Sequence, residues 1–172
     1  MTATQGSVRV RRDEQTVIFQ VEGWGRMSHS LPLRRFAEQA LAAGATSLRV
    51  DLRRCTHMDS TFLGTLLQLK REAERRGQGD FALVSPSPQC VQLLRQMGLE
   101  RLFYVETTPE GDAGTWTELC GEPPAGEGFK RNVIQAHEEL ARLDGPAGEP
   151  FREVLRCLKQ DPEAKKLAKP GG

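Results

Sequence analysis

Apolar residues follow a strand-like spacing in the first part of the chain. "SVRVRR" (residues 7–12) alternates apolar and polar side chains, and "TVIFQVEG" (residues 16–23) is more continuously apolar. A period of two is typical of a strand with one buried face, whereas an unbroken apolar run is typical of a strand buried more fully. Because only "DEQ" separates the two segments, they are predicted to form a β-hairpin.

Further along, helical and strand-like spacings alternate. Apolar residues at steps of three and four predict helices over residues 31–43, 60–76 and 88–98, the last with Ser87 as its cap and Pro88 in its first turn. Short apolar runs predict strands over residues 47–52, 81–84 and 101–106. Strands that alternate with helices indicate an α/β fold, with a parallel or mixed β-sheet on which the helices pack.

The amino-acid composition changes after residue 106. Residues 107–128 are rich in Gly and Pro and are predicted to be a linker. Two amphipathic segments follow, which predict a short helical extension over residues 129–168. Helices this short are marginal alone, so they are expected to pack on each other, on the domain or on a partner. The sequence thus predicts a domain over residues 8–106 that stays folded when residues 107–172 are deleted.

Composition excludes some classes of protein. The 172 residues carry 24 Lys/Arg and 23 Asp/Glu, and this balance argues against a nucleic-acid-binding protein, which would have a basic excess. No window approaches the roughly 20 apolar residues that span a membrane, and the N-terminus lacks the apolar core of a secretory signal. We therefore expect a cytoplasmic protein with reduced cysteines.

The sequence offers no recognisable site for a metal, a cofactor or catalysis. The cysteines lie too far apart for a metal-knuckle motif: Cys55, Cys90, Cys120 and Cys157. His57 lies near Cys55 but lacks further ligands, and His29 and His137 are expected at the surface. Gly23 and Gly25 match no phosphate-binding loop, and Trp24 between them is either an exposed contact residue or folded over the sheet edge. A non-enzymatic protein without cofactor or metal is predicted.

Candidate chemistry gathers where the strand of residues 47–52 gives way to the next helix. In "RCTHMDSTFLGTLLQL", Asp59 and Ser60 stand at the predicted helix start, and both are preferred capping residues. A hydroxyl at a helix start is also expected to face solvent beside unpaired backbone N–H groups, where a phosphate is tolerated. Capping and modification of Ser60 are compatible, and the pattern leaves both open.

The stretch "VDLRRCTHMDSTFLGTLLQLKREAERRG" resembles the STAS family, the anti-sigma factor antagonists of bacteria, in which a strand ending in Asp precedes Asp-Ser-Ser/Thr-Gly at a helix start. Asp51 matches the strand aspartate, and Asp59, Ser60 and Thr61 match the helix start. "SPSPQCVQLLRQMGLERLFYV" is similar to the family's penultimate helix and last strand. The resemblance covers residues 8–106 and implies a STAS-like mixed sheet packed with helices. One position departs from it, because Phe62 replaces the family glycine.

The resemblance implies a switchable binding module that regulates transcription. Ser60 would be phosphorylated, with Thr61 as a lesser candidate, by a serine-kinase anti-sigma factor that the unphosphorylated protein binds, and a protein phosphatase would reset it. The implied partner-binding residues are Asp51, Asp59, Thr61, Phe62 and Gly64. Two alternatives remain: a constitutive scaffold or adaptor, favoured by an exposed Phe62 ring, and a domain that binds a small molecule such as a nucleotide or lipid.

Overall fold

The predicted hairpin opens the fold. It consists of β1 (Ser7–Asp13) and β2 (Thr16–Gly25), which pair antiparallel with Val10 opposite Phe19. Both of these side chains are buried, so the apolar pattern of the two strands places one face of the hairpin on the core. This computed structural model describes residues 5–76, 79–107, 111, 113–121, 123 and 125–160.

The hairpin belongs to a mixed six-stranded sheet with the order β5-β4-β3-β2-β1-β6. Its other strands are β3 (Ser47–Met58), β4 (Asp80–Val84), β5 (Tyr104–Glu106) and β6 (Thr117–Leu119). Strands β2, β3, β4 and β5 run parallel to one another, whereas β1 is antiparallel to both β2 and β6. The predicted α/β fold with a mixed sheet is therefore confirmed.

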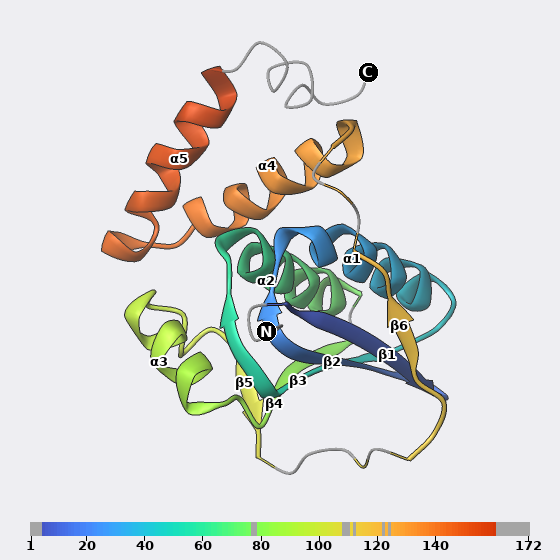
Figure 1. The fold of residues 1–172 in the computed structure, drawn as a ribbon. Coiled ribbons are helices and arrows are strands. Elements are labelled where there is room, and N and C mark those ends of the chain that lie inside the picture. The colour runs from blue at the N-terminus through green and yellow to red at the C-terminus, as the bar shows by residue number, and fades with distance from the viewer. Residues whose placement is uncertain are drawn as a thin grey trace.

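The helices form layers on this sheet (Figure 1). They are α1 (Met27–Ala42), α2 (Ser60–Arg75), α3 (Pro88–Gln96), α4 (Glu127–Ala141), the short 3-10 helix η1 (Gly145–Ala147) and α5 (Glu149–Gln160). Helices α1 and α2 lie on one face of the sheet, α4 lies over them as a further layer, and α5 lies beyond α4. Helix α3 packs beside β3. The face of α2 that points away from the sheet is thus covered by α4 and is not on the surface of the molecule.

Two elements are longer than their local pattern predicts. Strand β3 runs to Met58 instead of residue 52, because the end of β2 also pairs with it across two register shifts. Helix α1 begins at Met27 instead of residue 31 and includes Pro32. Its first N–H, on Met27, donates to a carboxylate oxygen of Asp59 at 2.6 Å. A partner distant in sequence therefore sets the start of α1.

The predicted linker contains a strand. Within residues 107–128, β6 pairs with β1, with Val10 opposite Thr117, so the linker interpretation is wrong for residues 117–119. The Gly- and Pro-rich composition concealed a strand of three residues that depends on its neighbour for pairing. The helical extension begins at Glu127 rather than residue 129, and residues 161–168 of its predicted range lie outside the described residues.

Candidate functional site at the start of helix α2

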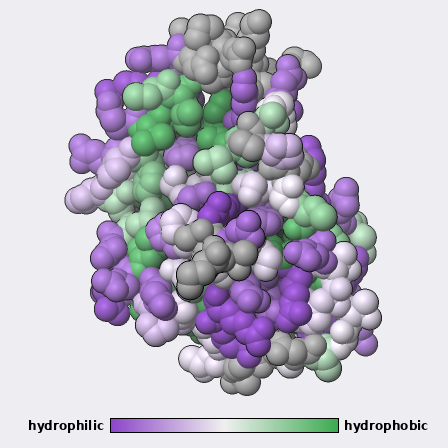
Figure 2. Space-filling view, in the orientation of Figure 1, coloured by the Kyte–Doolittle hydropathy of each residue, from purple (hydrophilic) through white to green (hydrophobic). Residues whose placement is uncertain are grey.

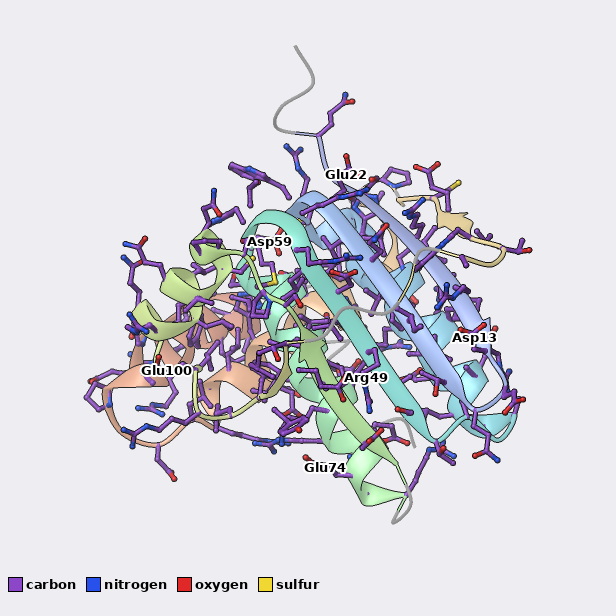
Figure 3. The ribbon with its side chains drawn as sticks, turned by 90° about the horizontal axis from the view of Figure 1, so that it is seen from below. Asp13, Glu22, Arg49, Asp59, Glu74 and Glu100 are labelled. Atoms are coloured by element: carbon purple, nitrogen blue, oxygen red, sulfur yellow. The ribbon has the colours of Figure 1, made fainter. Side chains whose placement is uncertain are left out.

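Asp59 caps α2 and joins it to α1. The residue has an extended backbone, and one of its carboxylate oxygens accepts the N–H of Phe62 at 2.8 Å, as an N-cap does. The other oxygen accepts the N–H of Met27. One carboxylate therefore satisfies the first free donor of α1 and one of those of α2. Figure 3 views the sheet from the side opposite to α1 and α2, with Asp59 at the end of β3.

Ser60 is the first residue of α2 and takes no part in that cap. Its side chain is half-buried, and its hydroxyl lies 3.1 Å from Nε2 of His137 in α4. The other ring nitrogen of His137, Nδ1, lies 2.8 Å from the carbonyl oxygen of Val133, which can only accept. In the neutral ring Nδ1 therefore donates to Val133, and Nε2 accepts the proton of the Ser60 hydroxyl. The hydroxyl therefore has a partner within the chain, and the side chain is only partly exposed to solvent.

One turn further along α2, Gly64 lets α4 approach closely. A methyl group built on Gly64 would overlap the backbone carbonyl of Ala136, so only glycine fits this helix crossing. An ion pair of 3.0 Å between Arg71 and Glu139 adds a polar contact between the same two helices. Ser60, Gly64 and Arg71 share the face of α2 that α4 covers. The family position Gly64 is thus part of an intramolecular contact.

Phe62 lies inside the molecule. Its side chain is 0% exposed, and a methyl group on Gly25 would lie 2.7 Å from its ring. The missing side chain of Gly25 therefore makes room for the ring that replaces the family glycine. The expectation of an exposed Phe62 ring, and with it the reason for preferring a constitutive adaptor, is wrong.

Two exposed apolar side chains lie beside the Asp59 cap. Trp24 is 37% exposed and Met27 is 40% exposed, and together with Arg26, Ser28 and Asp59 they line a shallow cavity of about 400 Å³. The ring of Trp24 lies 4.8 Å from that of His57, and the Arg26 guanidinium lies 5.3 Å above the indole. Trp24 is therefore held in place at the sheet end and still presents apolar area to solvent.

Comparisons with known proteins identify the family. Residues 8–105 match the family model described as "Mlab, STAS domain". The chain belongs to the STAS domain family. The matched residues exclude β6, α4 and α5, so the helix that covers Ser60 lies outside the STAS domain proper.

Solved structures share the fold of this STAS domain. One is the anti-sigma factor antagonist SpoIIAA in its unphosphorylated form, with a TM-score of 0.52, 24% sequence identity, and coverage of 58% of this chain and 88% of the other. A putative anti-sigma factor antagonist from Thermotoga maritima gives a TM-score of 0.52 at 21% identity, covering 58% and 85%. The likeness concerns the fold. No curated protein sequence matches the chain.

The remaining predicted residues of the STAS domain are buried. Thr61 is buried at the start of α2. Asp51 is buried on the opposite side of β3 from Val50 and Leu52, and its carboxylate binds Arg53 at 2.7 Å and accepts the backbone N–H of the same residue. Asp51 thus has the geometry of a residue that fixes its local chain. The partner-binding roles of these residues stay predictions.

His137 is the residue of this site that sequence reasoning missed. It was expected at the surface, but it is 5% exposed. The signal lies in the helical spacing: His137 follows Val133 by four residues and precedes Leu140 by three, which places it on the apolar stripe of α4. His29 is also buried, and burial first, then the nearby positive Arg26, lowers the pKa of its ring.

The described residues contain neither a metal-binding group of side chains nor a membrane-spanning helix. Within residues 5–76, 79–107, 111, 113–121, 123 and 125–160, no group of three His, Cys, Asp or Glu side chains is arranged to hold a metal ion. Among the same residues, no helix combines the length and the apolar character needed to cross a bilayer.

Proposed function

We propose that this STAS domain is a non-enzymatic, cytoplasmic protein-binding module that is switched by phosphorylation of Ser60. In its unphosphorylated form it binds a serine-kinase anti-sigma factor and so regulates transcription, and a protein phosphatase restores that form. The observation that carries the proposal is the position of the Ser60 hydroxyl at the first residue of α2, in a chain that belongs to the STAS family.

The helix cap is formed by Asp59 and not by Ser60, and this supports the switch. Because Asp59 caps α2, the Ser60 hydroxyl is not required for the helix start and can be modified without uncapping it. Ser60 is also better placed than Thr61 as an acceptor, since Thr61 is buried and Ser60 is half-buried. Thr61 remains the lesser candidate.

Charge explains how phosphorylation would release the partner. A phosphate adds about −1.5 to −2 charges, and the adjacent helix N-terminus favours such a charge by only ~0.3–1 kcal/mol. Two unit charges 4 Å apart interact by about 1 kcal/mol in water and about 4 kcal/mol at an effective dielectric constant of 20. Facing an acidic partner beside Asp59, the phosphate would repel it by several kcal/mol, and each 1.4 kcal/mol lowers affinity about tenfold.

The exposed pair Trp24 and Met27 extends this proposed surface. Both side chains line the cavity that includes Asp59, one residue before Ser60. Exposed aromatic and methionine side chains are enriched in the cores of protein interfaces. We therefore include them in the partner footprint with Asp59, the residue of the predicted binding set that reaches this surface.

One observation favours a second function, that of a constitutive scaffold or adaptor. The Ser60 hydroxyl already has a hydrogen-bond partner in His137, and a kinase must displace that partner to reach it. In an adaptor the hydroxyl would stay unmodified. The two functions differ in one measurable property, because binding by an adaptor does not depend on the charge at residue 60.

The proposal predicts the behaviour of two substitutions at Ser60. Incubation with the cognate kinase and ATP is expected to label the wild-type protein, and Ser60→Ala is expected to abolish the label. Ser60→Asp is expected to lower affinity for the anti-sigma factor by at least about tenfold, the effect of 1.4 kcal/mol of repulsion. The melting temperature is expected to fall by only a few degrees, because residue 60 caps nothing and the substitution disturbs a single hydrogen bond, that to His137. Mass spectrometry of the phosphopeptide, calorimetric titration and thermal unfolding measure the three effects.

Thr107→Asp serves as the matched control, since it adds the same charge at an exposed residue after β5. It is expected to bind as the wild type does. Label that persists in the Ser60→Ala protein would exclude this residue as the acceptor. Affinity that is the same in Ser60→Asp and wild type would identify the adaptor instead.

A further inference from the structure

Helix α4 covers the residues that the proposed function assigns to the partner. It accepts the Ser60 hydroxyl proton through His137, and its backbone at Ala136 touches Gly64. The face of α2 that begins at Ser60 is therefore occupied in this structure by a segment of the same chain, as the layering in Figure 1 shows. A partner that used this face would have to replace α4.

The contact between α4 and the domain contains many polar pairs for a helix packed on a core. Buried Asn132, His137 and Glu139 face the domain from α4. Their partners are Arg34 at 3.2 Å, Ser60 at 3.1 Å and Arg71 at 3.0 Å, respectively. The contact also buries Ile134 and Leu140. Each of the polar groups can hydrogen-bond to water after separation, and interfaces of this mixed character are typical of segments that move relative to one another.

The chain around α4 permits movement as a unit. The sequence before it, "CGEPPAG" (residues 120–126), is rich in Gly and Pro, and its last residue, Gly126, has a positive φ of 91°. Helix α5 follows and packs on α4 and η1. Figure 2 shows apolar surface gathered between α5 and α4. Val154 of α5 is 42% exposed. The α4–α5 pair, residues 127–160, is referred to below as the cover.

We propose that the cover is an intramolecular competitor of the partner: α4 occupies the α2 face around Ser60 and Gly64, and the partner and its kinase activity gain access when the cover swings away. The replacing partner element is a helix, because the close approach at Gly64 accepts a helix backbone in α4. This inference rests on the proposed function for the identity of the partner, and the opening itself does not depend on it.

The first experiment measures opening without a partner. In the full chain, the exposed cysteines are removed by Cys120→Ser and Cys157→Ser, while Cys55 and Cys90 are buried. Ser60→Cys then places a thiol under α4, and its labelling by a water-soluble maleimide reports how often the cover opens. The same protein without Ser60→Cys gives the background rate. We expect labelling at least about tenfold slower than for an unstructured cysteine peptide.

Gly64→Ala provides a specific way to open the cover. The added methyl group overlaps the Ala136 carbonyl, whereas alanine by itself favours the α2 helix over glycine. We expect labelling to rise at least about tenfold, which corresponds to 1.4 kcal/mol in the opening equilibrium. The matched control is Ile18→Ala, which removes a buried side chain of β2 outside the core that the cover shares, and is expected to leave labelling unchanged.

Three results would overturn the cover. The first is labelling in the starting protein as fast as that of the peptide, and the second is no acceleration by Gly64→Ala. The third is equal acceleration by Gly64→Ala and Ile18→Ala, which would mean that residue 60 is exposed only by global unfolding. Hydrogen exchange gives an independent reading: in Gly64→Ala the amides of α4 are expected to lose protection while those of β2 and β3 keep it. Loss of protection in all three would also overturn it.

The second experiment tests the competition. Leu140→Ala loosens the cover from the α4 side and leaves the α2 face intact, since Leu140 is a fully buried residue of α4. Its affinity for the purified serine-kinase anti-sigma factor is expected to rise severalfold over wild type. An unchanged affinity in a protein whose labelling shows opening would refute the competition. A protein that opens but binds no anti-sigma factor in any form would refute the proposed function and leave the cover in place.

Discussion

At the scale of single residues, the site depends on which side chain satisfies which donor. Asp59 accepts the backbone N–H of Phe62, so the neighbouring hydroxyl of Ser60 is available for another partner and finds it in His137. Because the Nδ1 proton of His137 is directed to the carbonyl of Val133, the ring presents an acceptor to Ser60. Phosphorylation of Ser60 removes the hydroxyl proton that Nε2 accepts, so the neutral hydrogen bond of the unmodified protein is replaced by a different contact.

This geometry predicts coupling between Ser60 and His137. Ser60→Ala and His137→Ala are each expected to destabilise the protein by roughly 1 kcal/mol, and the double variant by less than the sum, with a coupling of about 0.5–1.5 kcal/mol. Urea unfolding of the four proteins measures the cycle. Strictly additive effects would show that the two side chains do not depend on each other in solution.

At the scale of elements, one carboxylate accepts hydrogen bonds from the first turns of two helices. Asp59 accepts from Met27 at the start of α1 and from Phe62 in the first turn of α2. The first turn of α1 also carries exposed Met27, so the same contact that extends α1 positions part of the proposed partner surface. Helix structure and surface are therefore linked through this residue.

Replacing Asp59 tests that link. Asp59→Ala is expected to destabilise the protein by about 1–2 kcal/mol, since loss of an N-cap side chain has effects of this size. Asp59→Asn keeps an acceptor for one of the two donors and is expected to have a smaller effect. Ser87→Ala, which removes the cap of α3, is the matched control because it leaves α1 and α2 untouched. Chemical unfolding measures stability, and hydrogen exchange at Met27 reports whether the first turn of α1 opens. A protected Met27 amide in Asp59→Ala would contradict the link.

At the scale of the whole molecule, an added helical pair packs on a STAS domain. Residues 8–105 match the family, and α4 contributes Ile134 and Leu140 to the buried residues beyond them. Burial of such a side chain stabilises a protein by about 1.5–3 kcal/mol. The added pair therefore contributes to stability as well as covering Ser60, and its removal exposes the apolar and polar groups beneath it.

Deletion of residues 107–172 is expected to leave a domain that unfolds cooperatively but at a lower temperature. Loss of a few kcal/mol from a domain of this size lowers the melting temperature by on the order of 10 °C. Deletion of residues 149–172, which removes α5 and keeps β6 and α4, is the comparison and is expected to lower the melting temperature less. Scanning calorimetry measures both proteins. Gradual unfolding without a transition in the longer deletion would show that β6 and α4 are required for the fold.

The sequence by itself determined the order of elements and the local chemistry of their ends. Alternating and helical spacings predicted β1 to α3, and the "DST" motif located the start of α2, because capping and amphipathicity depend on near neighbours. It left the bounds of α1 and β3 short and missed β6, since these extensions depend on pairing with distant segments.

Only the tertiary structure decided what surrounds the site. Phe62 is interior because Gly25, far from it in sequence, has no side chain, and Ser60 is covered because His137 in α4 reaches it from 77 residues away. A spacing pattern shows that α4 has an apolar face but not which surface that face covers. That choice depends on the free energy of packing between segments distant in sequence, which no local pattern records.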